Sequence, residues 1–491
     1  MKLKIKRLNL VAGKPVCMIH EETAQKMSLH VANRVSIKSK SRRKIISVVD
    51  TAKGILKPDE IAVSEEIFEV LGLNDKEIVD VKIADGPRSI EFIKKKLNGN
   101  TLDKNEIREI IFDISNNALT EVEVAFFVSA VYKCDMNLDE TKYLIEAMVE
   151  SGNIMRLKGL VVDKHCIGGV AGNRTTPIVV SICAAAGLTM PKTSSRAITS
   201  AAGTADTIET IAKVDLSINE IKKVIRKTNA CFVWGGALGL APVDDKIIKI
   251  EKIANIDSTA QLLASILSKK ISVGSKYILI DIPCGKSAKV SIKDATKLKD
   301  KFLKLGEKFH LKIEVLLTDG SEPIGNGIGP ALEINDVIKV LRREDPPYDL
   351  EEKSLILAGK ILEMSGKAEK NKGIEMARKI LESNKAFMKF EQIINVQEGC
   401  VKMQEPAKFS YSIHADRKGK IKHIDNFFIN KIARHAGCPE DKQAGVYLHK
   451  KKSDVLIRGD KILTIYASTK EKLEYAKRSY KQNKKKMIEY W

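Results

Sequence analysis

Aromatic residues are scarce in this sequence, and long apolar runs are missing. Only 5% of the 491 residues are aromatic, and two of those are Trp. No apolar run reaches the roughly eighteen residues of a membrane-spanning helix, so none is expected. The net charge of +21 would suit nucleic acid or a membrane surface. Few side chains are available for base stacking, which argues against nucleic acid as a partner. The lack of a long apolar run argues against a membrane partner.

Cysteine is also sparse, and it is not arranged in metal-binding pairs. The eight cysteines are spread along the chain without a Cys-x-x-Cys motif, which argues against a zinc site and a disulfide framework. Residues 1–6 are basic, but no apolar signal core follows them. We therefore expect a protein of the reducing cytoplasm without a zinc site.

The most informative segment, residues 159–187, predicts a strand, a glycine loop and a helix. Residues 160–162 form a short apolar run typical of a buried strand. A Gly-Gly pair at 168–169 follows, then Thr-Thr-Pro at 175–177, an apolar run and a closing Gly187, which are helix start and stop signals. Such a loop points backbone N–H groups at one spot and favours an oxyanion. Lys164 would add a positive charge.

A second segment, residues 189–206, repeats this pattern with polar side chains in place of most glycines. Lys-Thr-Ser-Ser-Arg-Ala-Ile-Thr-Ser at 192–200 follows a short extended stretch, and Gly203-Thr204 and a helical run from Asp206 come next. These hydroxyls and cations predict a second anion-binding loop. Either loop alone could be an ordinary polar strand-to-helix turn, but two in tandem favour two anion sites.

The remaining chain predicts a multidomain α/β and α+β protein. Residues 1–84 contain a repeat with a spacing of 44, in which residues 20–38 match residues 64–82. Each copy reads as a short helix and a strand, so we expect a pseudo-twofold barrel similar to double-psi β-barrels, without a catalytic cluster. We expect it to serve in assembly or gating.

Three further domains follow this barrel. Residues 85–156 are helical, with apolar positions at 107, 110, 111 and 114 and a capping box at Thr120 and Glu123. Together with about 243–275 they should form a helical lobe. Residues 157–400 alternate strands and helices, which predicts a mainly parallel sheet with functional loops at the carboxyl ends of its strands. Residues 401–491 predict an α+β domain.

The motifs at 163–177 and 194–209 resemble those of the nucleoside phosphorylase-II family, which includes the thymidine and pyrimidine-nucleoside phosphorylases. The Lys-Thr-Ser-Ser-Arg-Ala-Ile-Thr-Ser form is most similar to the archaeal AMP phosphorylase branch of that family. The similarity runs from about residue 87 to the C-terminus. It implies phosphorolysis of nucleotides such as AMP, with inorganic phosphate as co-substrate and without a metal or other cofactor. It also implies a homodimer and a larger homo-oligomer assembled through the C-terminal domain.

The resemblance also implies the site residues. The family's contacts to inorganic phosphate align with Lys164, Thr176, Ser194 and Thr204. Contacts to the nucleotide are implied at Gly169, Ser195, Arg196, Ala197, Ile198, Thr199, Ser200, Thr204, Ser265, Lys269 and Lys289. Extra donors in the second loop make sense if the substrate brings its own 5′-phosphate.

This sequence departs from the family pattern at two positions. Cys166 stands where relatives carry Ser, which weakens one side-chain contact. Ile250 stands where the pyrimidine enzymes place an Arg that holds a pyrimidine carbonyl, and this favours a purine base.

Asp257 is the predicted catalytic residue. Residues 255–270 match a second family motif, and Ser265 and Lys269, four apart, share a helix face. From spacing alone Asp257 would be a helix N-cap. The resemblance implies instead that it protonates the leaving base, which would require burial to raise its pKa.

Two other enzyme classes and one binding function remain open. A pyrimidine-nucleoside phosphorylase would prefer uridine or thymidine to AMP. A phosphoribosyltransferase would need magnesium and pyrophosphate. A basic nucleic-acid-binding assembly is supported only by the net charge and the N-terminal barrel.

Overall fold

Two units make up the chain in the computed structural model, which describes residues 1–12, 15–41, 43–155, 157, 159–197, 200–254 and 256–491. The first unit comprises Met1–Ser151 and Pro242–Leu262, and the second comprises Gly152–Ala241 and Leu263–Trp491. Each unit therefore contains segments that are distant in sequence. No helix among the described residues has the length and apolar character needed to cross a bilayer.

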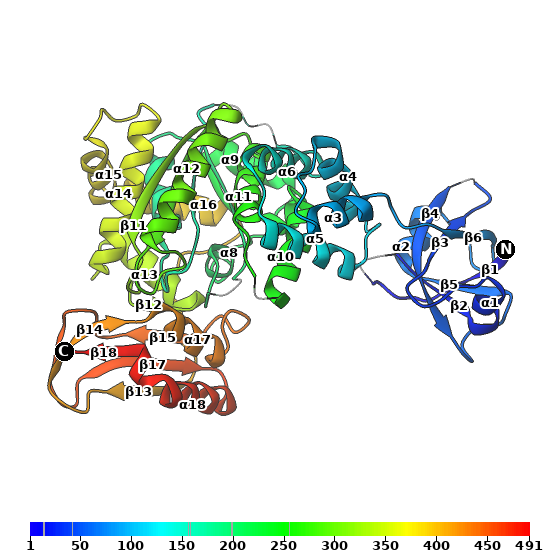
Figure 1. Cartoon of the computed structure of the whole chain (residues 1–491). Coiled ribbons are helices and arrows are strands. Elements are labelled where there is room, and N and C mark those ends of the chain that lie inside the picture. The colour runs from blue at the N-terminus through cyan, green and yellow to red at the C-terminus, as the bar shows by residue number, and fades with distance from the viewer. Residues whose placement is uncertain (13–14, 42, 156, 158, 198–199, 255) are drawn as a thin grey trace. The chain divides into compact units, whose positions relative to one another are not determined.

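The first unit begins with a closed barrel (Figure 1). Its strands follow one another around the barrel in the order β1-β5-β2-β4-β3-β6. The strands and their two short helices are β1 (Lys2–Arg7), β2 (Val16–His20), α1 (Glu21–Lys26), β3 (Arg34–Lys38), β4 (Lys44–Ala52), β5 (Glu60–Val63), α2 (Glu65–Leu71) and β6 (Ile78–Ala84).

The pairing of these strands shows the twofold repeat that the sequence predicted. β1 pairs in parallel with β5, as β4 does with β2, and β1 pairs antiparallel with β6, as β4 does with β3. Exchanging β1 with β4, β2 with β5 and β3 with β6 leaves the pattern unchanged. Leu29 and Leu73, which match in the repeat, are both buried. The repeat therefore marks equivalent core positions.

Helices form the rest of the first unit. They are α3 (Ser89–Leu97), α4 (Lys104–Ser115), α5 (Glu121–Cys134), α6 (Leu138–Glu150) and α10 (Pro242–Ala254). The four isoleucines predicted to share a face of α4 are buried, and the capping box of Thr120 and Glu123 at the start of α5 is confirmed. The ammonium of Lys246 on α10 donates to the carbonyls of Ile114 and Ser115 at 2.7 and 2.9 Å. This cation at the C-terminal end of α4 helps to hold α10 in the lobe.

A parallel sheet lies at the centre of the second unit. Its strands are β7 (Val162–Cys166), β8 (Met190–Ser194), β9 (Ala230–Trp234), β10 (Tyr277–Cys284) and β11 (Lys312–Asp319). They form two pieces, β11-β10-β7 and β8-β9, and every pair within them is parallel. A parallel bridge between Val161 and Thr189 joins the pieces. The predicted mainly parallel sheet is confirmed.

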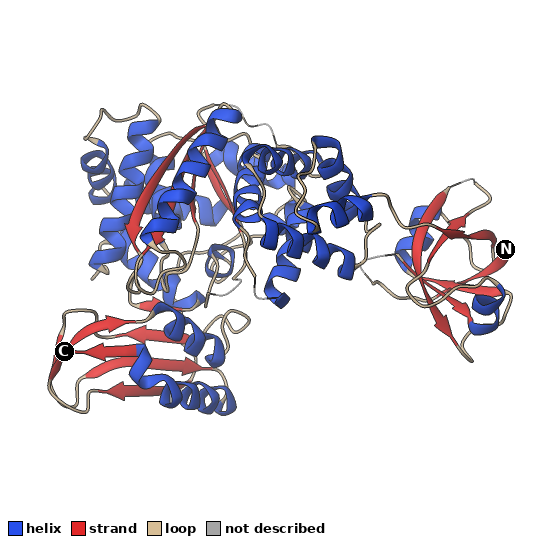
Figure 2. Ribbon diagram, in the orientation of Figure 1, coloured by secondary structure: helices blue, strands red, loops and turns tan. Residues whose placement is uncertain are grey.

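Helices surround this sheet (Figure 2). They are α7 (Thr175–Ala185), α8 (Thr204–Ile208), α9 (Ile218–Thr228), the 3-10 turn η1 (Gly235–Leu238), α11 (Thr259–Ser272), α12 (Ile292–Lys308), α13 (Pro330–Arg342), α14 (Tyr348–Met364), α15 (Gly373–Glu382) and α16 (Lys385–Val396). Residues 175–184 of α7 are all buried, against α14 and α16 among others. A helix that is apolar all round is held firmly by its surroundings, so its N-terminus has a defined position.

The C-terminal domain belongs to the same unit as the parallel sheet. Its elements are β13 (Phe409–His414), β14 (Gly419–Ile424), α17 (Asn426–Ala436), β15 (Gly445–Leu448), β16 (Val455–Leu456), β17 (Lys461–Ala467), α18 (Lys470–Met487) and β18 (Ile488–Tyr490). β12 (Gly327–Ile328), from the preceding domain, pairs with β15 at the edge of one sheet. The last strand, β18, follows α18 and pairs antiparallel with β14.

Candidate active site

Lys164 lies within strand β7, which continues beyond the apolar run at 160–162 that predicted a strand here. The strand extends to Cys166, and the loop begins at Ile167. The polar run continues the strand because β7 is paired with β10 over residues 162–166. Lys164 is therefore carried by the sheet itself, which defines its position more firmly than a loop would.

The ammonium of Lys164 lies at the N-terminus of α7. Its side chain is buried, and Nζ donates to the hydroxyls of Thr175 at 2.9 Å and Thr176 at 3.4 Å, the first two residues of that helix. Burial lowers the pKa of Lys164. A buried cation beside a helix N-terminus is a strong site for an anion. Burial disfavours the isolated positive charge, and a bound anion would neutralise it.

The glycine loop between β7 and α7 has a backbone that other residues rarely adopt. Gly168 has φ +88° and Gly169 has φ +91°. A Cβ on Gly169 would lie 2.6 Å from the Cβ of Lys289, whereas one on Gly168 would meet nothing within 4 Å. The structure thus brings Gly169 and Lys289 together, two residues that the family resemblance assigned to the nucleotide.

Cys166, at the end of β7, faces the same loop. The side-chain amide of Asn173 donates to its sulfur at 3.4 Å. Burial raises the pKa of the Cys166 thiol, so the sulfur is a neutral and weak hydrogen-bond partner. This supports the expectation that Cys166 offers less to an anion than a serine would.

The second loop is built differently from the prediction. β8 extends to Ser194, whose hydroxyl donates to the Val233 carbonyl at 3.3 Å, and the following helix α8 has only five residues. Asp206 on α8 accepts the backbone N–H groups of Ala197 at 2.7 Å and Gly203 at 2.9 Å. Two N–H groups that an anion could have used are thus bound by a carboxylate of the chain.

Arg196 in this loop is also paired with acidic residues. Its guanidinium donates to both carboxylate oxygens of Glu209, at 2.6 and 2.7 Å, and lies over the Trp234 ring at 4.7 Å. Arg196 lowers the pKa of Glu209 to about 2. A guanidinium engaged in this way braces the loop, because a bidentate pair fixes both partners.

The other residues predicted in this loop differ in their surroundings. Ser195 is exposed, and the Ser200 hydroxyl donates to the Ala202 carbonyl at 3.0 Å. Ile198 and Thr199 lie outside the described residues. Arg174 donates to the Thr204 hydroxyl at 2.9 Å and to the Ala202 carbonyl at 2.8 Å, while its Nε donates to Glu333. Arg174 therefore joins the two loops, a role that the sequence did not predict.

A buried charge network that connects β7, β8 and α11 was also missed. Asp163 on β7 accepts the Lys164 N–H at 2.7 Å and pairs with Lys270 of α11 at 2.7 Å and Lys192 of β8 at 3.3 Å. Burial lowers the pKa of Lys270. The signal was present in the Asp-Lys-His and Lys-Thr-Ser motifs, but only the fold shows that Lys270 completes the set.

The predicted catalytic residue Asp257 precedes α11, and the base-side residues Ser265 and Lys269 lie along that helix. The hydroxyl of Ser258 accepts the Gln261 N–H at 3.2 Å, so Ser258 caps the helix and the N-cap interpretation of Asp257 is wrong. Asp257 is exposed and lies in the first unit, so the burial expected of a proton donor is not found there. Ser265 and Lys269, in the second unit, are half-buried on α11.

No group of His, Cys, Asp and Glu side chains in the described ranges could hold a metal ion. The arrangement in the second unit can hold an anion at Lys164 and α7, and it offers a second polar loop beside it. Those two loops are joined by Arg174.

Comparison with known proteins gives matches along most of the chain. Residues 90–152 match the helical bundle domain of a glycosyl transferase family, and residues 158–387 match its a/b domain. Residues 420–486 match a pyrimidine nucleoside phosphorylase C-terminal domain.

Individual relatives match over nearly their full length. The chain is 42% identical to an AMP phosphorylase of Pyrococcus furiosus, over 97% of this chain and 95% of that one. It is 41% identical to AMP phosphorylase 1 of Archaeoglobus fulgidus over the same shares. It is also 41% identical to an AMP phosphorylase of Methanocaldococcus jannaschii, over 94% of this chain and 92% of the relative.

Among solved structures, the fold is similar to anthranilate phosphoribosyltransferase from Thermus thermophilus. The TM-score is 0.53 at 17% identity, covering 62% of this chain and 99% of that one. At this identity the likeness concerns the fold alone.

Proposed function

Since this chain belongs to the family of the AMP phosphorylases, we propose that it cleaves AMP with inorganic phosphate to give adenine and ribose 1,5-bisphosphate. The observation that carries the proposal is the similarity to AMP phosphorylases at 40–42% identity over nearly the full chain. The family resemblance predicted from the two loops is confirmed by these matches.

In the proposed reaction a phosphate oxygen forms a bond to C1′ of the ribose while the bond from C1′ to the purine nitrogen breaks. The electron pair of that bond stays on the purine, which takes up a proton. Asp257 is the proposed donor of this proton, a role that rests on the family motif. Positive charge that develops on the sugar is offset by the phosphate, so no metal or cofactor is required.

Inorganic phosphate is proposed to bind at Lys164, with Thr176, Ser194 and Thr204 as further donors. Supporting this site are the burial of Lys164 and its place at the start of α7. An anion at that point would accept hydrogen bonds from a cation whose charge burial disfavours. Bound phosphate would then neutralise the buried ammonium of Lys164 before the reaction starts.

The nucleotide is proposed to bind beside it. Its contacts would come from Gly169, Lys289, Ser265, Lys269, Thr204 and the loop of residues 195–200. Within that loop Arg196 would act by holding the backbone in place, since its guanidinium already donates hydrogen bonds to the Glu209 carboxylate. Ile250 in place of a pyrimidine-binding Arg supports a purine substrate. CMP and UMP are the other nucleotides to be compared.

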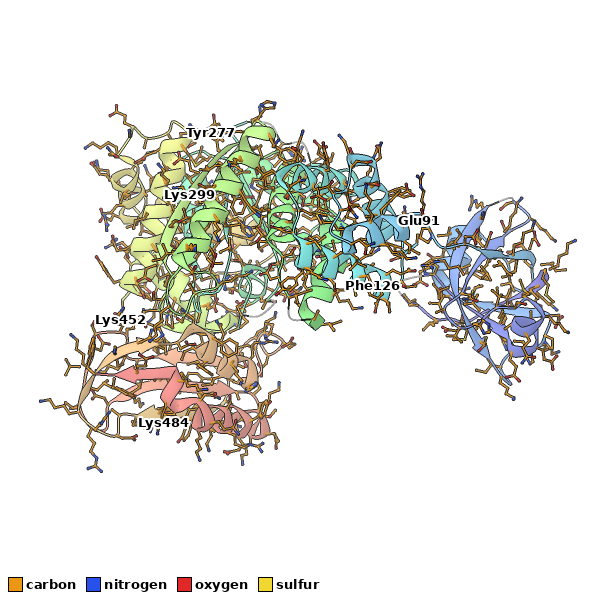
Figure 3. All side chains as sticks on the ribbon, in the orientation of Figure 1. Glu91, Phe126, Tyr277, Lys299, Lys452 and Lys484 are labelled. Carbon is orange, nitrogen blue, oxygen red and sulfur yellow. The ribbon has the colours of Figure 1, made fainter. Side chains whose placement is uncertain are left out.

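The proposal extends to the assembly and compartment of the enzyme. Two exposed apolar side chains on α5, Val122 and Phe126, are one turn apart and support a homodimer or larger homo-oligomer. Phe126 is labelled in Figure 3. All eight cysteines are free, which supports the reducing cytoplasm. The twofold pairing of the barrel supports a double-psi barrel that serves in assembly or gating.

One assay tests the proposed reaction. Release of free base would be followed from AMP, CMP, UMP, adenosine, uridine and thymidine, each with phosphate and a chelator. We expect adenine from AMP only when phosphate is present. Preference for uridine or thymidine would indicate a pyrimidine-nucleoside phosphorylase, and activity that needs magnesium and pyrophosphate would indicate a phosphoribosyltransferase.

A second experiment tests Asp257. The Asp257→Asn variant should lose turnover of AMP by about 10²-fold or more while binding AMP with similar affinity. The matched variant Asp245→Asn, on an exposed face of α10, should keep its activity. Full turnover by Asp257→Asn would exclude Asp257 as the proton donor.

A further inference from the structure

Helix α17 of the C-terminal domain contacts the loops of the candidate active site through two asparagines. Asn426 and Asn430 are four residues apart and therefore share a face of the helix. Both are buried, with 1% and 8% of the residue exposed. Asparagines so deeply buried need hydrogen-bond partners, and the partners identify what this face holds.

Asn426 connects the ends of adjacent strands. Its side-chain oxygen accepts the N–H of Ala171 in the glycine loop after β7 at 2.9 Å. Its amide nitrogen donates to the Ser287 hydroxyl, after β10, and to the Gly320 carbonyl, after β11, both at 2.9 Å. The order of these strands in the sheet is β11-β10-β7. One side chain thus ties together the loops at the carboxyl ends of all three.

Asn430 reaches the other loop. Its side-chain oxygen accepts the N–H of Ala201 at 3.0 Å. Lys442, between α17 and β15, adds charge to the same region by pairing with Asp206 at 3.3 Å and Glu209 at 2.7 Å. These are the two acidic residues that hold the backbone and the guanidinium of the second loop.

The C-terminal domain is joined to the sheet domain in a way that makes this support firm. β12 of the sheet domain pairs with β15. Glu322, after β11, accepts the N–H of Ile424 at 2.8 Å and bonds His423 at 2.6 Å. Contacts spread over several segments resist the tilting of α17 that a single contact would allow.

We propose that Asn426 and Asn430 are positioning residues of the active site, Asn426 for the glycine loop with the neighbouring Lys289 segment and Asn430 for the second loop. The C-terminal domain then has a role in catalysis within its own chain, in addition to any role in assembly. The assignment of substrates to the loops rests on the proposed function, whereas the assignment of each asparagine to its loop does not.

The two asparagines should have different kinetic effects. Asn430→Ala should raise the KM for AMP about tenfold, because a buried N–H loses its acceptor and the loop loses its fixed position. The KM for phosphate should rise less, by about threefold at most, since Lys164 and Thr176 are held by β7 and α7 and Thr204 is the one proposed phosphate donor within the loosened segment. Asn430→Asp keeps the acceptor oxygen and should restore most of the affinity. Asn426→Ala should raise both KM values and lower kcat, because it releases three loops.

Hydrogen exchange of the full-length protein without substrate provides a readout independent of turnover. Asn430→Ala should speed exchange in residues 200–206 but not in 167–174, and Asn426→Ala should speed it in 167–174. Asn483→Ala is the matched control, since the side-chain amide of this asparagine donates to the Ser479 carbonyl within its own helix, α18. It should change neither loop.

The outcomes separate this inference from the proposed function. If wild type fails to release adenine from AMP but the exchange pattern is found, the proposed function fails and the positioning roles stand. If both alanine variants speed exchange equally in both loops, or in neither, the positioning roles are wrong. They are also wrong if Asn430→Asp behaves like Asn430→Ala in exchange and in KM.

Discussion

The glycine loop and the second loop contain similar donors but use them differently. Beside the glycine loop, the ammonium of Lys164 on β7 donates to the hydroxyls of Thr175 and Thr176, and burial disfavours its charge. In the second loop Arg196 is paired with Glu209, and two backbone N–H groups are bound by Asp206. The number of donors in a loop therefore does not measure its capacity for an anion; what counts is whether the fold supplies acceptors first.

The largest expected effect tests Lys164, the cation beside the glycine loop. Lys164→Met should lower kcat/KM for phosphate by about 10²–10³-fold, because the anion loses its buried partner. Its thermal stability should be unchanged or higher, since a buried cation is removed. Lys297→Met, on an exposed face of α12, is the control and should keep full activity. If Lys164→Met lost only a little kcat/KM for phosphate, Lys164 would not be the anion-binding cation that distinguishes the glycine loop from the second loop.

A pair of adjacent glycines tests the shape of the same loop. Gly169→Ala should lower activity by about 10–10²-fold, because its Cβ would lie 2.6 Å from that of Lys289 and displace a nucleotide contact. Gly168→Ala shares the left-handed φ but meets nothing within 4 Å, so it should show only the cost of the backbone strain. Steady-state kinetics of both variants checks this. Equal losses would mean that strain, rather than the close approach, sets the effect.

A double-mutant cycle tests the bracing role of Arg196 in the second loop. Arg196→Ala and Glu209→Ala should each raise the KM for AMP about fivefold, and the double variant should be no worse than either, a coupling of about 1 kcal/mol. If Arg196 bound the nucleotide directly, Arg196→Ala would be far more harmful than Glu209→Ala. If the effects of the two substitutions on the KM for AMP are additive, Arg196 contacts the nucleotide directly instead of bracing the loop.

The smallest expected effect is the pH dependence of this same pair. The pKa of Glu209 is about 2 in the fold and higher in the unfolded chain, so its carboxylate stabilises the fold above about pH 4.3. This contribution is lost as the pH falls towards 2. The gap in melting temperature between wild type and Glu209→Gln should thus narrow between pH 6 and pH 3.

Asp336 gives a control of opposite sign for that measurement. Burial raises its pKa to about 6, so its effect on stability is favourable below its unfolded pKa and is lost as the pH rises through 6. The melting temperature of wild type should rise relative to that of Asp336→Asn as the pH falls from 7 to 4. If both gaps move in the same direction, a general effect of acid is responsible.

Local patterns were sufficient to predict much of this molecule. The apolar runs, the Gly-Gly pair and the Thr-Thr-Pro start predicted β7, the glycine loop and α7, because strand and helix signals act within a few residues. The twofold repeat predicted the barrel, and the capping box at Thr120 marked the start of α5. The family motifs predicted membership of the AMP phosphorylases, which the relatives confirm.

Hydrogen-bond partners were decided by the folded chain alone. Ala171 and Asn426 are 255 residues apart, and Ala201 and Asn430 are 229 apart, yet each pair shares a buried bond. Ser258 rather than Asp257 caps α11. The guanidinium of Arg196, which the family motif assigned to the nucleotide, donates to Glu209. The sequence specifies which residue can donate a hydrogen bond. Its acceptor is the group that the packing of distant segments brings within about 3 Å.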